Sequence, residues 1–538
     1  MTATIRVGAA TCGLAAGAEA TADAIGRFLV DRGIDARLER VGCLGACHRE
    51  PLVEILRNGT STLLGPLTAE GVPGAFDVLF RGRPVDGVAD AIVSRRQDRA
   101  DYPFLGRQRK VSTRLCGAID PESLDAFLAN DGYRALRAAL AMEPEAIVAA
   151  VRDAHLRGRG GAGFPTATKW DMARRSPGQP KYLVCNADEG DPGAFMDRAI
   201  IEGDPHRILE GMLIAGRAIG ASTGYIYVRA EYPLAVRRLR NAIEQADRHG
   251  VVGRNILGSD FDFSFVIKEG AGAFVCGEET ALMRSIEGYR GTPSMRPPYP
   301  TARGLWGHPT TINNVETLAL VPSILLNGPA WFAAMGTERS GGTKAFALSG
   351  SIARPGLVEV PIGIPLRELL YDIGGGGRDG RDLKAVQLGG PSGGCVPAAL
   401  FDTRVDYEDL RQTGAIMGSG GMVAVDESAC MVDLARFFLR FTQEESCGKC
   451  VPCRIGTRKM LSIVSRVSAG QASLDDIARL ESLCATVRDG SLCGLGQTAP
   501  NPVLTTLRYY RDEYEAHIRD RTCRTGSCRI GEPVVAGR

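Results

Sequence analysis

Three cysteines at two-residue spacing are the residues of this chain best suited to metal chemistry. The segment ESCGKCVPCR (445–454) contains Cys447, Cys450 and Cys453, and Cys493 follows in SLCGLGQTAPNP. Three thiolates at this spacing can hold one face of an iron–sulfur cube, and a distant fourth can complete the site, so the set predicts a 4Fe–4S cluster. Four cysteines also suit tetrahedral zinc, although zinc sites usually use two paired CxxC units.

A glycine-rich loop could hold a phosphate. The segment HLRGRGGAGFPTATKW (155–170) contains a G-x-G-x-x-G pattern that begins at Gly158. A Rossmann unit places this pattern after a strand, whereas a helical segment precedes it here, so the motif alone is weak. The loop nevertheless offers backbone N–H groups, and Arg159 and Lys169 offer cations.

Three further segments combine glycines with acids or amides. YLVCNADEGDPGAFMDR (182–198) is a buried strand that runs into an acidic loop, and EGAGAFVCGEETALMRSIEG (269–288) is a glycine-rich turn that enters a helix. TTINNVET (310–317) places Asn313 and Asn314 at a helix start. Amides and helix N-termini suit phosphates and the polar edge of a flavin. Each segment alone could equally be an ordinary cap or turn, because Asn, Asp and Gly routinely occupy such positions.

The composition is that of a multidomain globular protein. The chain has 538 residues, and 64 Lys and Arg against 62 Asp and Glu leave a net charge of +2, which argues against a nucleic-acid surface. We find no apolar run long enough for membrane insertion and no signal peptide, and we expect a cytoplasmic protein. Fifteen cysteines without an export signal favour metal or redox roles over disulfides.

The pattern of elements predicts several domains, because a domain typically takes about 100–200 residues. Residues 1–100 read as a small α/β unit, and alternating loops, strands and helices predict a second α/β domain over 110–335. Short strand-like runs over 340–425 predict a small α+β module, and helical periodicity over 430–515 predicts a helical bundle. Residues 516–538 form a tail with Cys and His.

Together these segments resemble the flavin-bearing, NADH-oxidising subunit of respiratory complex I and its relatives. The relatives are the diaphorase subunits of NAD-linked hydrogenases and the beta subunit of NAD-dependent molybdenum or tungsten formate dehydrogenases. The resemblance covers about 110–515. It implies an α/β multidomain protein with a thioredoxin-like N-terminal domain, a non-classical Rossmann-like FMN/NAD domain, a ubiquitin-like (SLBB) α+β module and a C-terminal helical bundle with the iron–sulfur cluster.

The resemblance also implies which residues bind the cofactors. Gly160, Lys169 and the amides and acids after the strands would hold FMN, Phe164 would stack beside the dinucleotide, and Glu279 would bond the adenosine ribose. A carboxylate there would repel a 2′-phosphate, which favours NAD over NADP. The full predicted set is Gly158, Arg159, Gly160, Gly161, Phe164, Lys169, Asn186, Asp188, Glu189, Asp191, Phe274, Gly277, Glu278, Glu279, Arg296, Tyr299, Asn313 and Asn314.

Three of these residues depart from the family pattern. Asp191 stands where the family usually carries the longer Glu, and Arg296 and Tyr299 stand where complex I relatives often carry Lys and Phe. These differences put the affinity for the nucleotide in question, not the type of cofactor.

Both ends of the chain hold further cysteines. The N-terminal region resembles a thioredoxin-like 2Fe–2S ferredoxin, but it has only Cys12, Cys43 and Cys47, with Gly17 where the resemblance places the fourth ligand. Because a cluster needs four ligands, we expect a degenerate domain without one. In the tail, His517, Cys523 and Cys528 could hold zinc with a fourth cysteine, which we assign to Cys484. An exposed tail with reduced thiols is the alternative.

The resemblance implies an NAD-linked flavin electron-transfer subunit. Hydride would move between NAD(H) and FMN, and single electrons between FMN and the 4Fe–4S cluster. The fused N-terminal domain and short tail most resemble the formate dehydrogenase beta subunit, with a 2Fe–2S ferredoxin subunit and a large molybdenum or tungsten iron–sulfur subunit as partners. A hydrogenase diaphorase or complex I subunit is the alternative within the class. A zinc-stabilised, nucleotide-binding assembly module without turnover is the alternative outside it.

Overall fold

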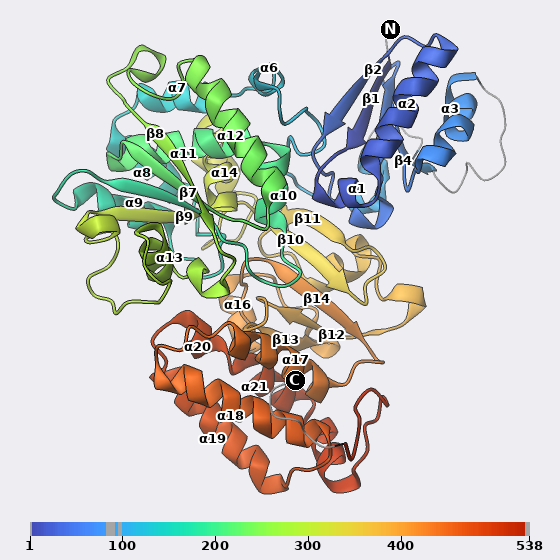
Figure 1. Cartoon of the computed structure of the whole chain (residues 1–538), viewed down its shortest axis with the longest axis vertical. Helices are drawn as coiled ribbons and strands as arrows, with labels where there is room; N and C mark the ends of the chain where they lie inside the picture. Colours follow the sequence, from blue (N-terminus) through green and yellow to red (C-terminus); the bar gives the residue numbers. More distant parts are fainter. Residues whose placement is uncertain (1–2, 82–91, 95–98, 533–538) are drawn as a thin grey trace.

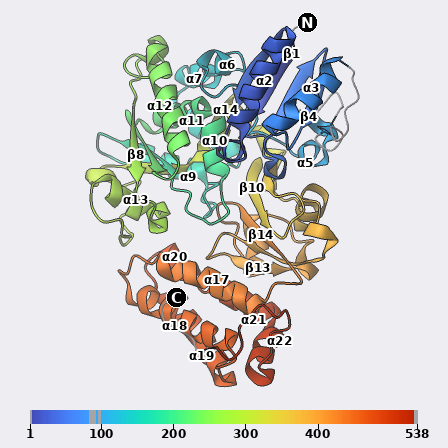
Figure 2. The same ribbon diagram turned by 45° about the vertical axis from the view of Figure 1, so that its right-hand side comes forward.

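The computed structural model describes residues 3–81, 92–94 and 99–532. The charged stretch SRRQDRADYPFLGRQRKV (94–111) is predicted to be a linker, and its residues 95–98 lie outside the described part. Four modules follow one another along the chain (Figure 1). We call them the N-terminal unit (3–94), the central unit (110–335), the small β module (343–426) and the C-terminal bundle (431–532). The small β module lies between the central unit and the C-terminal bundle, as the turned view also shows (Figure 2).

The N-terminal unit is a mixed sheet with the strand order β2-β1-β3-β4-β5. Its first two strands are parallel and the others antiparallel. A parallel neighbour requires a crossover, which the helix α2 supplies. The elements are β1 (Ala3–Gly8), α1 (Thr11–Ala15), α2 (Ala18–Arg32), β2 (Ala36–Val41), β3 (Val53–Arg57), β4 (Thr60–Leu64), α3 (Val72–Arg81) and β5 (Ile92–Ser94).

The central unit contains a parallel sheet with the order β8-β7-β6-β9. Helix α11 (Pro205–Ile219) is buried along almost its whole length, as expected for a helix that is apolar on most faces. Strand β6 pairs with β7 on one side and with β9 on the other, so the strand order reverses between β6 and β9. The strands are β6 (Tyr182–Ala187), β7 (Thr223–Arg229), β8 (Ser264–Gly270) and β9 (Thr310–Asn314).

Helices cover this sheet and follow its strands. Those used below are α8 (Pro144–Asp153), α9 (Thr166–Arg175), α10 (Met196–Gly203), α12 (Pro233–Arg248), α13 (Glu279–Ile286) and α14 (Val315–Asn327). Because ligands of open α/β sheets bind beyond the carboxyl ends of strands where the order reverses, the ends of β6 and β9 mark the expected crevice.

The small β module is a five-stranded sheet with the order β11-β10-β14-β12-β13, in which β10 and β14 run parallel. It comprises β10 (Thr343–Gly350), β11 (Gly356–Pro361), β12 (Leu383–Leu388), β13 (Gly394–Pro397), α16 (Tyr407–Gln412) and β14 (Gly421–Asp426). Its core of aliphatic side chains also receives residues from the N-terminal unit and the linker, such as Leu44 and Phe104.

The C-terminal bundle is helical, in agreement with the periodicity of its sequence. It consists of α17 (Met431–Glu444), α18 (Val451–Ser468), α19 (Leu474–Gly490), α20 (Gly494–Thr498), α21 (Asn501–Tyr509) and α22 (Arg511–Glu515), followed by a π-helical turn over 516–520. None of the helices in the described residues has both the length and the apolar surface that a membrane crossing requires.

A fully buried ion pair joins the central unit to the small β module. The ammonium of Lys344, in β10, lies 2.9 Å from the carboxylate of Glu316, in α14, and neither side chain is exposed to solvent. Lys344 also donates to the carbonyls of Arg159 and Ser419, and Glu316 accepts from the backbone N–H of Ala345. Burial raises the pKa of Glu316, and Lys344 opposes that shift.

Removing one partner of this pair should destabilise the protein strongly. Lys344→Met leaves a buried carboxylate without compensation, and we expect a loss of about 3–5 kcal/mol. The double variant Lys344→Met/Glu316→Leu should recover part of it, because replacing both charges with apolar groups is close to neutral. Thermal unfolding measures both. Arg367→Met, which removes an exposed ion pair with Asp402, is the control and should leave the midpoint unchanged. Equal midpoints for Lys344→Met and Arg367→Met would contradict the structural role of Lys344.

Candidate functional site

A large candidate pocket opens where β6 and β9 end. Its volume is about 570 Å³, within the range of small-molecule sites. Residue pairing in the sheet sets Asn186 beside Asn314 at the two strand ends. Ten of the predicted cofactor residues line this pocket: Gly160, Gly161, Asn186, Asp188, Glu189, Asp191, Phe274, Gly277, Glu278 and Asn314.

The glycine loop is held between the central unit and the small β module. An added Cβ at Gly160 would lie 3.0 Å from the side chain of Asn314, and one at Gly163 would lie 2.4 Å from the ring of Tyr407. Gly161 has a φ of +123°, which L side chains rarely adopt. The loop therefore needs its glycines for close approach, and its backbone can reach a ligand where a side chain could not.

Buried carboxyl groups line the floor of the pocket. Burial raises the pKa of Asp188 to about 7, and neither of its carboxylate oxygens has a hydrogen-bond partner in the described residues. Burial also raises the pKa of Asp191 to about 6, although Ser419 donates to that carboxylate. Unpaired buried carboxylates are costly, so these groups fit a ligand that brings hydroxyl or N–H donors.

Two amides and two further acids also line the pocket. Asn314 caps α14 and donates to Asp197 at 2.6 Å. Glu189 accepts from the backbone N–H groups of Asp197 and Arg198 at the start of α10. Burial, with Glu189 close by, holds the pKa of Asp197 well above its usual range. The side chain of Asn186 donates to the carbonyl of Gly277 at 3.0 Å, so it links strand β6 to the turn before α13.

Three other predicted residues, Lys169, Glu279 and Arg296, lie together beside this pocket. Glu279 forms ion pairs with Arg296 and with Lys169, whose ammonium is 3.6 Å away. Arg296 also lies 3.8 Å from Glu278, which lines the pocket and caps α13. Phe164 and Tyr299 are exposed aromatic side chains. Charged and aromatic groups of this kind could contact the polar and planar parts of a dinucleotide.

Three predicted phosphate or flavin contacts are corrected by the structure. The guanidinium of Arg159 is fully buried and donates to the carbonyls of Thr343, Gly341 and Arg157, so it holds the loop to the small β module rather than offering a cation to the pocket. The side-chain oxygen of Asn313 accepts from the indole of Trp170 at 2.9 Å, and Asn313 does not line the pocket. Gly158 likewise stays outside, with its carbonyl bonded to Tyr407.

Sequence reasoning missed the far wall of the pocket. It comes from the small β module and the C-terminal bundle, and consists of Gly389, Ser392, Tyr407, Arg411, Ile416, Met417, Gly418, Ser419, Gly494, Leu495, Gln497 and Thr498. Arg411 is the cationic side chain of this wall. Only the glycine clusters at 389–390 and 418–421 offered a signal in the sequence, because glycines often mark close backbone approach.

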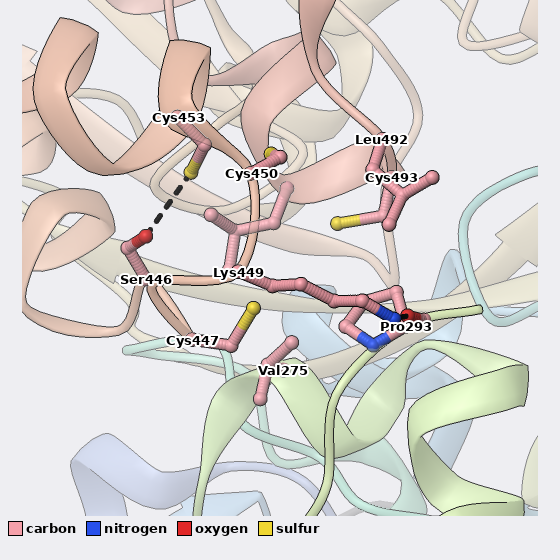
Figure 3. A pocket seen from close by; sticks show the side chains of 10 residues that line it. Val275, Pro293, Ser446, Cys447, Lys449, Cys450, Cys453, Leu492 and Cys493 are labelled. Atoms are coloured by element: carbon pink, nitrogen blue, oxygen red, sulfur yellow. Dashed lines mark hydrogen bonds between the residues drawn. The ribbon is translucent and has the colours of Figure 1, made fainter. Parts of the chain in front are cut away.

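The four cysteines of the predicted cluster line one small cavity (Figure 3). Cys450 caps α18 and Cys493 caps α20, so helix N-termini, which favour negative charge, begin at two of the ligands. Burial raises the pKa of Cys453 to about 11 and also raises that of Cys493. Buried thiols at this spacing need a metal to stabilise their thiolate forms. The donor set therefore fits an iron–sulfur cluster.

The cluster cavity and the pocket share a wall. Val275 and Leu495 line both of them. Three contacts hold the cysteine loop against the central unit: the N–H of Phe274 donates to Glu445 at 3.0 Å, Lys449 donates to the carbonyl of Pro293, and Arg290 donates to the carbonyl of Cys447. The two candidate sites are thus held next to each other by direct bonds.

The pocket fits FMN on the same physical grounds. The glycine loop admits close backbone approach, and the unpaired oxygens of Asp188 await donors such as the ribityl hydroxyls or the flavin N–H. Both observations concern residues that the resemblance assigned to FMN.

The tail cysteines meet a partner that was not predicted. Cys430, His517, Cys523 and Cys528 have ligand atoms within 4.8 Å of one another. Cys484 is not a member of this group: it lies inside α19 in the apolar core of the bundle, where burial raises its pKa to about 12. The choice of Cys484 as fourth ligand was wrong because sequence distance hid the position of Cys430 at the start of α17.

The N-terminal cysteines gather beside the central unit. The free thiols of Cys12 and Cys43 lie beside that of Cys47 and raise its pKa, and Arg198 donates to the sulfur of Cys12. Gly17 does not complete this set, because an added Cβ there would meet nothing within 4 Å.

Known proteins match the chain over these modules. Residues 151–323 match the Nuo51 FMN-binding domain, 346–396 the SLBB domain and 433–517 the NADH-ubiquinone oxidoreductase-F iron–sulfur binding region. The chain is 54% identical over 422 residues to the NADP-reducing hydrogenase subunit HndC of Solidesulfovibrio fructosivorans, with 78% of this chain and 86% of that protein aligned.

Two further matches reach the same family. The NADH-quinone oxidoreductase F 2 protein of Rhizobium meliloti (strain 1021) is 46% identical over 75% of this chain and 96% of its own length. A crystal structure of an NAD+-reducing [NiFe]-hydrogenase in the H2-reduced state superposes with a TM-score of 0.68 at 34% identity, over 96% of this chain and 84% of that chain. The predicted FMN and 4Fe–4S cofactors are thereby confirmed at the level of these domains, and NAD binding is expected for this family. The chain belongs to the NADH-quinone oxidoreductase-F family.

Proposed function

We propose that this chain is the NAD(H)-linked electron-transfer subunit of a larger complex. FMN in the pocket supplies hydride exchange with NAD(H) and single-electron exchange with the 4Fe–4S cluster. The observation that carries the proposal is the wall shared by the two cavities, formed by Val275 and Leu495. Adjacent sites for a two-electron and a one-electron carrier are what such a subunit requires.

The protein's own residues bind and orient rather than react. The glycine loop presents backbone N–H groups, and Asp188, Asp191 and Glu189 accept hydrogen bonds from a hydroxyl-rich ligand. Residues of the small β module line the far side of the pocket and would contact a ligand bound there. No side chain needs to act as acid or base for a hydride transfer, so the protein contributes positioning and electrostatics.

The charged group beside the pocket supports NAD as the nucleotide. Glu279 would accept from the ribose hydroxyls and repel a 2′-phosphate. Arg296 and Lys169 argue for NADP instead, because two cations beside Glu279 could bind the 2′-phosphate. The HndC relative is named as NADP-reducing, so NADP is the second candidate.

The proposal also concerns the complex to which this subunit belongs. A formate dehydrogenase, with a 2Fe–2S ferredoxin subunit and a molybdenum or tungsten subunit in the cytoplasm, is the assignment suggested by the fused N-terminal unit. The names of the relatives favour a hydrogenase or an NADH-quinone oxidoreductase instead. Mass spectrometry and metal analysis of the co-purified complex decide: molybdenum or tungsten supports the first, and nickel or a hydrogenase iron site the second.

The N-terminal unit is proposed as a degenerate thioredoxin-like domain. Its three gathered thiols lack a fourth sulfur at Gly17, and its contacts are structural: Thr11 donates to Glu202 and Arg238 to the carbonyl of Ala9. We propose a docking role for this unit rather than a second cluster. More iron per chain than the 4Fe–4S cluster accounts for would contradict the proposal that the N-terminal unit holds no cluster.

The first prediction concerns the cluster ligands. Cys453→Ala or Cys493→Ala should remove the cluster's iron and its broad visible absorption, because three ligands do not hold the cube. FMN should remain and still be bleached by NADH, whereas Cys395→Ala, a buried cysteine of β13, should keep both chromophores. Visible spectra and iron analysis measure this. A colourless, zinc-containing wild-type protein would support the non-redox alternative and overturn the proposal.

The second prediction follows from Asp188. Its folded pKa of about 7 exceeds the usual value near 4, so the flavin-free fold binds the extra proton between those pH values and loses stability as pH rises through that window. Asp188→Asn should therefore stabilise the flavin-free protein relative to wild type at pH 8 but not at pH 4, and weaken FMN binding about tenfold or more. Thermal unfolding and flavin fluorescence measure the two effects. The exposed Asp260→Asn is the control, and unchanged FMN affinity in Asp188→Asn would exclude a direct flavin contact.

The third prediction separates the two nucleotides. Wild type should prefer NADH, and Glu279→Gln should shift the ratio of kcat/KM toward NADPH by about tenfold, because the carboxylate no longer repels a 2′-phosphate. Steady-state kinetics with a dye acceptor measure both substrates. Glu287→Gln, just beyond the end of α13 and bonded to the backbone of Trp306, is the control. If the wild type preferred NADPH, the proposed repulsion by Glu279 would be wrong, and Arg296 and Lys169 would bind the 2′-phosphate.

A further inference from the structure

We propose that Cys430, His517, Cys523 and Cys528 bind a single structural zinc ion that fastens the C-terminal tail to the start of α17. None of these residues belongs to the 4Fe–4S set, and the proposal is independent of the flavin chemistry. The four residues come from two regions far apart in sequence, the N-cap of α17 and the segment 517–528.

The distances suit tetrahedral coordination. The sulfur of Cys430 lies 3.5 Å from that of Cys528 and 3.7 Å from Nε2 of His517, and all four ligand atoms lie within 4.8 Å of one another. Metal–sulfur bonds of about 2.3 Å in a tetrahedron separate the ligands by about 3.7 Å. The ligand atoms therefore already stand close to the corners that one ion requires.

The histidine is oriented for a metal. Nδ1 of His517 donates to the carbonyl of Glu513 at 2.7 Å, which leaves the lone pair of Nε2 directed at the thiols. Metal-binding histidines generally fix their tautomer through such a bond to a carbonyl. His517 is buried, with 1% of its surface exposed, so this arrangement is built into the bundle rather than formed by a loose surface side chain.

Hydrogen bonds and an ion pair near the four ligands show which elements meet at this site. The backbone N–H of Met431, next to Cys430, donates to the carboxylate of Glu513, which also pairs with Lys384 in β12 at 2.6 Å. Beyond the ligands, the N–H of Gly531 donates to the carbonyl of Ala469 after α18. An ion here would join the start of α17 to the tail, next to the ion pair by which Glu513 contacts the small β module.

The donor set selects the metal. Three thiolates and one imidazole are soft and borderline ligands, which suit zinc and exclude magnesium and calcium. Four protein ligands leave no open position, as in structural zinc sites. The competing states are a disulfide between Cys430 and Cys528 and a single iron in the same place.

Metal analysis of the full chain, purified in its complex without added chelator, tests the proposal. We expect one zinc per chain in addition to the cluster iron. Cys523→Ser and Cys528→Ser should each lower zinc about tenfold or more while FMN and cluster iron stay constant. Cys484→Ser, a buried cysteine of the same bundle outside the group, should retain zinc.

Wild-type protein provides a second test that needs no variant to fold. An organomercurial that titrates thiols should release one zinc per chain to a chromophoric chelator, and thiol counting after denaturation should find Cys430 and Cys528 reduced. Absence of zinc from the wild type, a Cys430–Cys528 disulfide, iron replacing zinc, or full zinc in the Cys528→Ser protein would each overturn the proposal.

Discussion

The ammonium of Lys344 joins three segments around the candidate pocket. It pairs with Glu316 at the start of α14 and donates to the carbonyls of Arg159, in the glycine loop, and Ser419, in the small β module. A charge that is wholly removed from water must keep all its partners, because losing one leaves an uncompensated buried group. Lys344 thereby ties the loop to both modules at one buried point, in addition to the bonds that Arg159 makes to the carbonyls of Thr343 and Gly341.

The buried carboxyl groups of the pocket lower the folding stability of the protein when no ligand is bound. Asp188 keeps two unpartnered oxygens among the described residues, and Asp191, Glu189 and Asp197 are carboxyl groups whose pKa values burial raises. These groups lower the stability of the flavin-free fold and become satisfied when a ligand brings donors. Stability given up at a site in this way is a common feature of binding and catalytic pockets. The charges of Glu316 and Lys344 both act on the pKa of Asp197, the first raising it and the second lowering it, so the buried pair is electrostatically coupled to the pocket.

Helix α17 links the two metal-binding regions that we assign. It begins directly after Cys430, one of the proposed zinc ligands, and ends shortly before Cys447, the first cluster ligand. The loop after it is bonded to the central unit through Glu445 and Lys449. An ion at Cys430 would thus fix the start of α17. The other end of the same helix leads into the cluster loop, which lies beside the candidate pocket.

The sequence by itself determined the chemistry that depends on short spacing. The Cys447–Cys453 triplet, the glycine loop and the acidic segment after β6 act within a few residues, and local spacing specifies their geometry. The order of the modules was equally readable, because apolar periodicity reports secondary structure. Only the tertiary structure decided that Arg159 and Asn313 turn away from the pocket, that Arg411 and Ser419 line it, and that Cys430 replaces Cys484 beside His517. Those outcomes rest on contacts between residues distant in the chain, and packing, not spacing, determines which of several chemically equivalent side chains comes within bonding distance.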